Sequence, residues 1–430
     1  MDTVILGASE VAHLSSADPK TGRIDGADLL DRKKNIDEDV GIHIRNGIIK
    51  RMASNEEIQH EWGHIRPDTH QRIHITPDGN RWINTNGKAI VPGFVDAHTH
   101  LLWDGDRSHE MALKIEGKTY QELSKLGMGI STTVKATRDA NLNRLIEIGE
   151  KRIQRARSMG TTTMEAKSGY GLDSDTELRM LLAAKSLEDV QDAPSLHHTW
   201  LGAHAYPLGV DRQEWNLHLV DEQLPAIIEQ GIATSVDVFC EPGWFDLEVT
   251  EDIVRTAMKN GLRSRLHVDE FVDGGGLNLA AEMKVDSADH AGYSSDDARA
   301  KASEAGVNTG FLPGTPYVHG DPMSGAIEKC IKEGWKWSMA TDFNPNCRSL
   351  SIPFVGSLAV HRMRIPPIAA LAAVTVNAAA TLETPLGTGQ LIEGGVADLN
   401  ILQTENADGW CLMPGDNPVE LSIHHSTLIS

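Results

Sequence analysis

Two hydrophobic patterns alternate through the middle of this chain. Stretches with apolar residues three and four positions apart are typical of helices that bury one face, and several of them end at glycine, as helices often do. Short apolar segments rich in β-branched residues stand between them and predict strands. The predicted helices cover residues 141–159, 176–190, 222–231, 247–261 and 325–334. The predicted strands cover residues 91–100, 160–169, 196–206, 235–241, 263–271, 285–292, 306–314 and 337–345.

Strands that alternate with helices in this way predict an α/β fold, a (β/α)₈ TIM-type barrel rather than a doubly wound sheet. No glycine-rich dinucleotide fingerprint follows the first predicted strand, which also argues against a Rossmann fold. Outside residues 89–386 the sequence pattern predicts short strands separated by turns. Both chain ends, residues 1–88 and 387–430, are therefore predicted to build one small β-sandwich domain beside the catalytic barrel domain.

The amino-acid composition limits the kinds of molecule that this protein is expected to bind. The 430 residues include 40 Lys and Arg against 61 Asp and Glu, a formal charge of −21. Such a chain repels nucleic acid and anionic lipid, so we expect neither as a partner. No apolar run is long enough to span a bilayer, and the N-terminus lacks the pattern of a signal peptide. The four cysteines form no CxxC pair, so we expect neither disulfides nor a Cys-based zinc site, and a cytoplasmic location.

Polar residues collect at the carboxyl ends of the predicted barrel strands, where barrel enzymes place their working residues. They are His98, His100, His204, His267, His290 and Asp342. Residues i and i+2 of an extended segment point the same way, so His98 and His100 can bind one ion. Imidazole together with carboxylate suits zinc or iron. The HxH pair alone is weak evidence for a metal site, because neighbouring groups can satisfy the hydrogen bonds of two polar residues at a strand end. The whole set of six residues favours a metal site.

Two carboxylates and one further histidine have a catalytic interpretation. Glu270 follows His267 by three residues and can exchange a proton with a metal-activated water, unless it is a surface loop residue. Asp342 lies in an otherwise apolar to small segment, where an unpaired carboxylate would be costly to bury. His290 is either a polarising group or a core histidine bonded to the backbone.

Arg107 and Tyr170 lie in loops after the first and second predicted strands. An arginine above a barrel mouth suits a substrate carboxylate. The alternative is a surface arginine paired with Asp104, Asp106 or Glu110. The phenol of Tyr170 can donate to a substrate oxygen, or it simply caps the barrel.

Several segments in order carry a resemblance to a known family. They are DAHTHLLWDGDRSHE, EAKSGYGLDSDTELRML, LGAHAYP, VDVFCE, HVDEF, SADH and ATDFNP. This series resembles the imidazolonepropionase family, within the amidohydrolase superfamily of metal-dependent barrel hydrolases. The similarity covers residues 90–385 well and the two ends loosely. HxH is common to the superfamily, whereas KSGYGL with the arginine after HxH is far more specific.

The resemblance implies hydrolysis of the cyclic amide 4-imidazolone-5-propanoate to N-formimidoyl-L-glutamate, in histidine degradation, by a metal-activated water. It implies one metal ion, zinc or iron, on His98, His100, His267 and Asp342. It implies contacts of a small anionic substrate with Arg107, Tyr120, Tyr170, His204 and Asn344. It implies acid–base and polarising roles for Glu270, His290 and Asp342, and it suggests a homodimer.

Two details qualify the resemblance. Superfamily members with two metals usually bridge them through a modified lysine on the fourth strand, and residues 235–241 contain none, so one metal is expected. Where the family usually has a glycine and a small hydroxyl residue after DFNP, this chain has Asn346 and Cys347. The contacts to the substrate's carboxylate are expected to differ there.

Two rival functions stay open. HxH, HxxE and the aspartate of the eighth strand serve a ring deaminase of the same superfamily equally well, but a neutral nucleobase gives Arg107 no reason to point inward. The other rival is a non-catalytic metal-binding barrel used for assembly, in which Glu270 would have no functional role.

Overall fold

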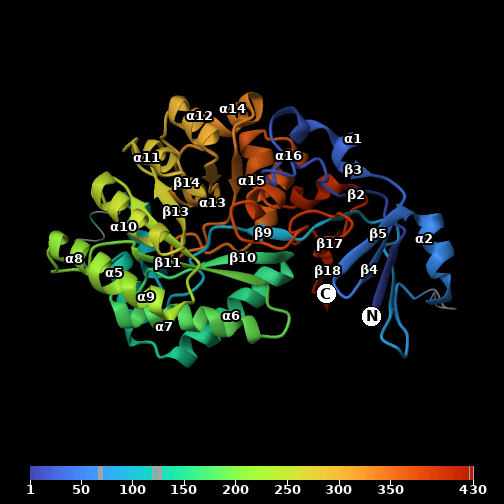
Figure 1. Ribbon diagram of the computed structural model, residues 1–430, viewed down its shortest axis with the longest axis horizontal. Coiled ribbons are helices and arrows are strands. Elements are labelled where there is room, and N and C mark those ends of the chain that lie inside the picture. The colour runs from blue at the N-terminus through green and yellow to red at the C-terminus, as the bar shows by residue number, and fades with distance from the viewer. Residues whose placement is uncertain (66–70, 119–121, 123–127, 426, 430) are drawn as a thin grey trace.

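The computed structural model describes residues 1–65, 71–118, 122, 128–425 and 427–429, and its largest part is a parallel barrel (Figure 1). Within the described residues, eight strands pair in chain order from β9 to β16. They are β9 Phe94–Asp96, β10 Thr161–Lys167, β11 Ser195–Ala203, β12 Ser235–Cys240, β13 Arg263–Val268, β14 Ser287–His290, β15 Asn308–Phe311 and β16 Trp337–Met339. The prediction of a (β/α)₈ barrel is confirmed. Each predicted strand contains one of these strands, except that β11 begins one residue before its predicted range.

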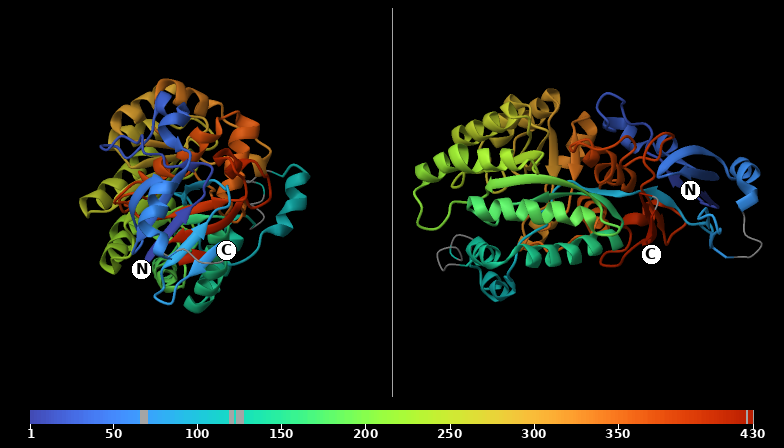
Figure 2. Two further views of the ribbon diagram at one scale, coloured as in Figure 1. Left: turned by 90° about the vertical axis from the view of Figure 1, so that its right-hand side faces the viewer. Right: turned by 60° about the horizontal axis from the view of Figure 1, so that its bottom comes forward.

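Helices connect the barrel strands or follow the last of them, and most of these helices cover the outer face of the barrel (Figure 2). They are α3 Met111–Ile115, α5 Ile130–Asp139, α6 Leu142–Ser158, α7 Ser174–Ser186, α8 Arg212–His218, α9 Leu224–Gln230, α10 Leu247–Lys259, α11 Gly276–Met283, α12 Asp296–Ala305, α13 Gly314–His319, α14 Ala326–Glu333, α15 Ile352–Met363, α16 Pro367–Ala373 and α17 Val376–Ala379. Side chains of Asn141 and Asp246 cap α6 and α10 by accepting backbone N–H bonds, which satisfies donors that a helix start leaves open. Gly231 and Gly334 end α9 and α14 in the left-handed conformation, as the sequence predicted.

The two chain ends build a pair of sheets beside the barrel, and both termini lie at that end of the molecule (Figures 1 and 2). One sheet has the order β5-β4-β1-β7-β6 and the other β19-β18-β17-β8-β2-β3. Their strands are β1 Asp2–Leu6, β2 Val11–Ala12, β3 Ile36–Asp37, β4 Val40–Arg45, β5 Ile48–Ser54, β6 Ile73–Ile75, β7 Arg81–Asn84, β8 Ile90–Pro92, β17 Leu399–Leu402, β18 Val419–His424 and β19 Thr427–Ile429. The N-terminal region also forms the short helices α1 Arg32–Asn35 and α2 Asn55–Trp62.

One apolar core joins the two sheets, because Ile5 and Ile44 of the first share a buried cluster with Leu399 and Ile423 of the second. This is the arrangement of a sandwich. The chain leaves it through β8 and enters β9 at once, across Gly93, where a Cβ atom would lie 2.3 Å from Thr162 Oγ1. The predicted domain limits, at residues 88 and 387, stay a prediction.

The barrel closes along a seam between β9 and the segment after β16. Both oxygens of the buried Asp96 carboxylate accept from Thr341, at 2.9 Å from its backbone nitrogen and 2.6 Å from its hydroxyl. Thr99 then pairs with Phe343 in a parallel bridge. Because β9 ends at Asp96, the two histidines of HxH lie beyond the strand itself, and this seam holds them instead.

Replacing Asp96 by alanine leaves the backbone N–H and the hydroxyl of Thr341 without their acceptor in a buried position. Unsatisfied buried donors cost roughly 1–3 kcal/mol, so we expect Asp96→Ala to lower the melting temperature of the metal-free protein. Asp96→Asn keeps one acceptor oxygen and is the control. Equal melting temperatures for the two variants in scanning calorimetry would contradict the role of Asp96 in closing the barrel.

Candidate active site

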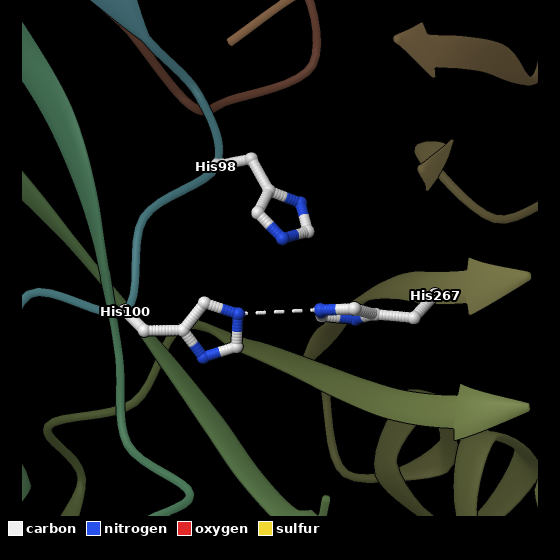
Figure 3. A group of neighbouring side chains, drawn as sticks. All are labelled: His98, His100 and His267. Atoms are coloured by element: carbon white, nitrogen blue, oxygen red, sulfur yellow. Dashed lines mark hydrogen bonds between the residues drawn. The ribbon is translucent and has the colours of Figure 1, made fainter. Parts of the chain in front are cut away.

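Imidazole rings from different parts of the barrel meet at its carboxyl end. The ring nitrogens of His98, His100 and His267 lie within 4.8 Å of one another, and Figure 3 shows the three rings directed at one point. The Nε2 atoms of His100 and His267 are 3.3 Å apart. Asp342 Oδ1 lies 3.6 Å from Nε2 of both His98 and His100. His98, His290 and Asp342 form a second group of the same kind.

The donor atoms fit a metal ion. His98 Nε2 and Asp342 Oδ1 are buried and make no hydrogen bond with any described residue, which is costly unless something else satisfies them. Burial lowers the pKa of His98, His100 and His267 well below the usual range. The rings are therefore neutral at neutral pH, which is the form that binds metals.

Carboxylates behind two of the rings fix their orientation. His98 Nδ1 lies 2.7 Å from Asp289 Oδ2, and His267 Nδ1 lies 3.0 Å from Asp237 Oδ2. An ionised carboxylate only accepts hydrogen bonds, so each ring carries its proton on Nδ1 and presents Nε2 to the common point. Such partners hold metal-binding histidines in one tautomer and one orientation.

Two buried cations support these carboxylates in turn. Lys167 Nζ lies 2.6 Å from Asp237 Oδ2 and 2.8 Å from Glu165 Oε2. Arg265 Nη2 lies 3.2 Å from Asp289 Oδ2, and its Nε lies 3.2 Å from Glu165 Oε1. Burial alone would lower the pKa of Lys167, but Asp237 and Glu165 outweigh it and raise the value. Two chains of contacts, from Lys167 and from Arg265, thus converge on the histidines.

Residue spacing on two strands is a sequence signal for this buried network. Glu165 and Lys167 are two positions apart on β10, as are Arg265 and His267 on β13. Residues at that spacing point to the same side of a strand. Charged residues repeated on the inward side of barrel strands indicate a buried network beneath the strand ends.

Glu270 and His290 lie side by side next to Asp342. His290 Nε2 is 3.6 Å from Glu270 Oε2 and 4.0 Å from Asp342 Oδ2. Burial, together with the nearby Asp342, raises the pKa of Glu270 well above its usual range. Burial raises the pKa of Asp342 to about 6 and lowers that of His290 to about 4. Only 13% of the Glu270 side chain is exposed, so Glu270 is not a surface loop residue, and His290 faces carboxylates rather than backbone.

A carboxylate of the neighbouring strand holds the loop that carries Glu270. Glu241, at the end of β12, accepts from the backbone nitrogens of Glu270, Phe271 and Val272 at 2.9, 3.1 and 3.0 Å. Asp269 accepts from the backbone of Gly274, Gly276 and Leu277 further along the loop. The loop therefore follows a path set by two buried carboxylates, and neither was singled out in the sequence.

Arg107 is buried, with 5% of its surface exposed, and lines the same cavity as Glu270. Its Nε and Nη2 bind Glu110, at 3.0 and 2.9 Å. Glu110 also accepts from the backbone nitrogen of Gly129 at 2.7 Å. The pairing with Glu110 that the sequence left open therefore exists, but it holds Arg107 at the cavity instead of on the surface.

Other predicted contact residues surround the same cavity. Tyr170 and His204 line it, and His204 Nδ1 lies 2.8 Å from the carbonyl of Gly169. Asn344 also lines it, and its Oδ1 accepts from the backbone nitrogens of Asn346 and Cys347 at 2.7 and 3.1 Å.

Two of the remaining predicted positions are placed differently. Asn346 lines the cavity, whereas Cys347 is buried and does not line it. Tyr120 lies outside the described residues. The cavity itself has a volume of about 80 Å³, and His100, His204, His267 and His290 are among its lining residues.

Lys167 offers a test of the buried network. Lys167→Met removes the cation beside Asp237 and Glu165, and an unpaired buried carboxylate tends to take up a proton, so the contact with His267 weakens. Loss of such a supporting partner typically lowers metal affinity about 10–100-fold. Chelator competition on metal-free protein measures this affinity. The control is Lys135→Met, on the exposed face of α5. Unchanged affinity in a folded Lys167→Met protein would refute the network's role.

Comparison with solved structures supports the barrel. The chain resembles the 5-methylcytosine deaminase from Klebsiella pneumoniae, with a TM-score of 0.70 and 19% identity over 99% of this chain and 98% of that chain. It also resembles a triazine hydrolase variant, with a TM-score of 0.68 and 15% identity over 99% and 94%. At these identities the similarity shows the fold alone.

Comparison of sequences is more specific. A model of the amidohydrolase family matches residues 121–409. The imidazolonepropionase of Haloarcula marismortui is 35% identical over 100% of this chain and 96% of its own length. That of Symbiobacterium thermophilum is 35% identical over 94% and 91%, and that of Halobacterium salinarum is 38% identical over 80% and 84%. The chain therefore belongs to the imidazolonepropionase family of metal-dependent amidohydrolases.

Proposed function

We propose that this protein hydrolyses 4-imidazolone-5-propanoate to N-formimidoyl-L-glutamate, a step of histidine degradation. The observation that carries the proposal is the position of Arg107. This buried cation lines the same small cavity as Glu270, Asp342 and the convergent histidines. A substrate that combines a carboxylate arm with a cyclic amide matches both ends of that cavity.

One metal ion, zinc or iron, is proposed to bind His98, His100, His267 and Asp342. The donor set of imidazoles and one carboxylate suits both metals. When bound, the ion supplies an activated water at neutral pH and polarises a carbonyl. The protein's own contribution is to keep the rings neutral and to orient them through Asp237 and Asp289.

Other residues that line the cavity are proposed to orient the substrate. Arg107 is proposed to bind the propanoate, because the planar fork of donors on a guanidinium matches the geometry of a carboxylate. Tyr170, His204 and Asn344 are proposed to bind the ring and its oxygens, and Tyr120 stays a predicted contact. Binding energy at the carboxylate then places the ring amide against the reacting groups, so that it contributes to turnover as well as to affinity.

Proton transfer is proposed to run through Glu270. As a carboxylate it accepts the proton of the attacking water, and it then returns that proton to the ring nitrogen as the carbon–nitrogen bond breaks. A raised pKa suits both halves of this cycle. The neutral ring of His290, beside Glu270, offers an N–H to the oxyanion that develops on the carbonyl. Asp342 is proposed as a metal ligand whose charge also raises the pKa of Glu270.

The expected homodimer and cytoplasmic location stay proposals that rest on the family and on composition. The strongly acidic net charge of −21 argues against nucleic acid and anionic membranes as partners. Among the described residues, no helix is both long enough and apolar enough to cross a bilayer.

Arg107→Ala is the first test of the proposed function. Loss of two charge-assisted hydrogen bonds should lower kcat/KM for 4-imidazolone-5-propanoate by at least on the order of a hundredfold, with the metal retained. Absorbance of the imidazolone follows the reaction. The control is Arg144→Ala, which removes a solvent-exposed guanidinium of α6. Ammonia release from ring substrates would instead favour the deaminase. Metal content without turnover of any cyclic amide would favour a non-catalytic barrel.

Glu270→Gln tests the proton path. If Glu270 must be ionised to accept the water proton, kcat/KM falls as pH drops through its pKa. Because that pKa is raised, the acid limb should lie above the ordinary range of glutamate. In Glu270→Gln we expect turnover at least 10²-fold lower, no acid limb from this group and unchanged metal content. An identical pH profile in the variant would exclude Glu270 as the base.

A further inference from the structure

A second cavity adjoins the catalytic one on the side of Glu270 and His290. It has a volume of about 360 Å³, several times that of the catalytic cavity. Both cavities are bounded by Glu270, His290, Thr315 and His319. The acid–base pair therefore stands on the wall between them. We call the larger cavity the apolar chamber, because most of its remaining lining is apolar, although Asp321 and Ser324 also border it. The apolar residues include Phe311, Leu312, Pro313, Pro316, Met323 and Met363.

The groups along the two cavities follow a fixed order. Arg107, Tyr170 and His204 line the catalytic cavity and not the chamber. Phe311 and Leu312 line the chamber and not the catalytic cavity. A ligand that spans both would thus have its anionic end at Arg107, its reacting part at Glu270 and His290, and an apolar end in the chamber.

The walls of the chamber are positioned by the barrel itself. Phe311 is the last residue of β15, and Leu312 and Pro313 follow it before α13. Met363, the last residue of α15, closes another side. Methionine adapts to the shape of what packs against it. Apolar cavities with a few polar groups at one end are typical binding sites for small molecules.

We propose that the apolar chamber is a subsite for an apolar substituent carried on the amidine edge of the imidazolone ring. This rests on the proposed function. With the carboxylate at Arg107 and the leaving nitrogen at Glu270, the amidine carbon of the ring faces the chamber. The enzyme therefore accepts 2-alkyl and 2-aryl imidazolone propanoates. One water is consumed, the bond from the carbonyl carbon to the ring nitrogen breaks, and the substituent stays on the amidine of the glutamate product.

Stable ring analogues provide the probe. Inhibition constants are measured for 3-(imidazol-4-yl)propanoate with hydrogen, methyl, propyl or phenyl at C2, against turnover of 4-imidazolone-5-propanoate by the metal-loaded protein. Burial of each added methylene should tighten binding about fourfold. Turnover of the 2-methyl imidazolone should match that of the parent substrate within about tenfold, because a pocket discriminates a single methyl group only weakly.

Filling the chamber should remove the gain. In Met363→Trp the ratio of inhibition constants between the unsubstituted and the 2-propyl compound should fall to about one. Met258→Trp, the same change at an exposed position of α10, is the matched control. It should leave this ratio of inhibition constants as in the unmodified protein. Gly292 also lines the chamber. Gly292→Val is therefore a second filling variant, because a Cβ atom there would meet only carbonyl oxygens at 3.9 and 4.0 Å.

The outcomes separate this inference from the proposed function. A protein that hydrolyses the parent imidazolone but binds the 2-propyl compound no more tightly than the unsubstituted one has no such subsite. An unchanged ratio in both filling variants would overturn the inference in the same way. Failure to hydrolyse the parent substrate would instead overturn the proposed function.

Discussion

The seam that closes the barrel is the constraint on which the site depends. A parallel sheet of this kind forms a barrel only if its first and last strands meet, and here Asp96 joins them by accepting two hydrogen bonds from Thr341. Immediately beyond this contact the backbone nitrogen of Asp342 donates to the carbonyl of His98 at 3.1 Å. The first and last strands therefore deliver their donor atoms to one point because the barrel closes there, and the metal-binding geometry follows from the closure.

Closure alone would leave the rings free to rotate, and the buried charges beneath them restrict this. Lys167 and Arg265 are almost wholly buried, where an isolated charge is very unfavourable. Each is matched by carboxylates, and Glu165 contacts both. Such a network is weak as a source of stability. The network instead fixes the orientation of the histidine rings, because the cations keep Asp237 and Asp289 ionised as hydrogen-bond acceptors for them.

The sequence predicted the barrel because its eight strands are separated by helices with clear periodicity, and because parallel strands bring their carboxyl ends to one rim. The same rule brings His98, His267, His290 and Asp342 together, as the structure shows, while their chemical roles stay predictions. The sequence did not predict which side chains of different strands are in contact. Nothing in the spacing of Lys167 and Asp237, or of Glu241 and Glu270, indicates that they touch, since strand register and loop path decide those pairs.

Backbone conformation at the rim adds a last step to this account. Asp269, His290 and Asp342 have φ values of 50°, 68° and 49°, in a region that non-glycine residues seldom adopt. Each occurs where a strand turns into its loop, and residues held there persist only when surrounding contacts over-determine them. Asp269 is held by backbone donors of the loop, and Asp342 is held by Thr315 and the seam. The left-handed turns direct the side chains of His290 and Asp342 into the barrel mouth, so the stability of the packed loops maintains a reactive geometry that the chain would not adopt alone.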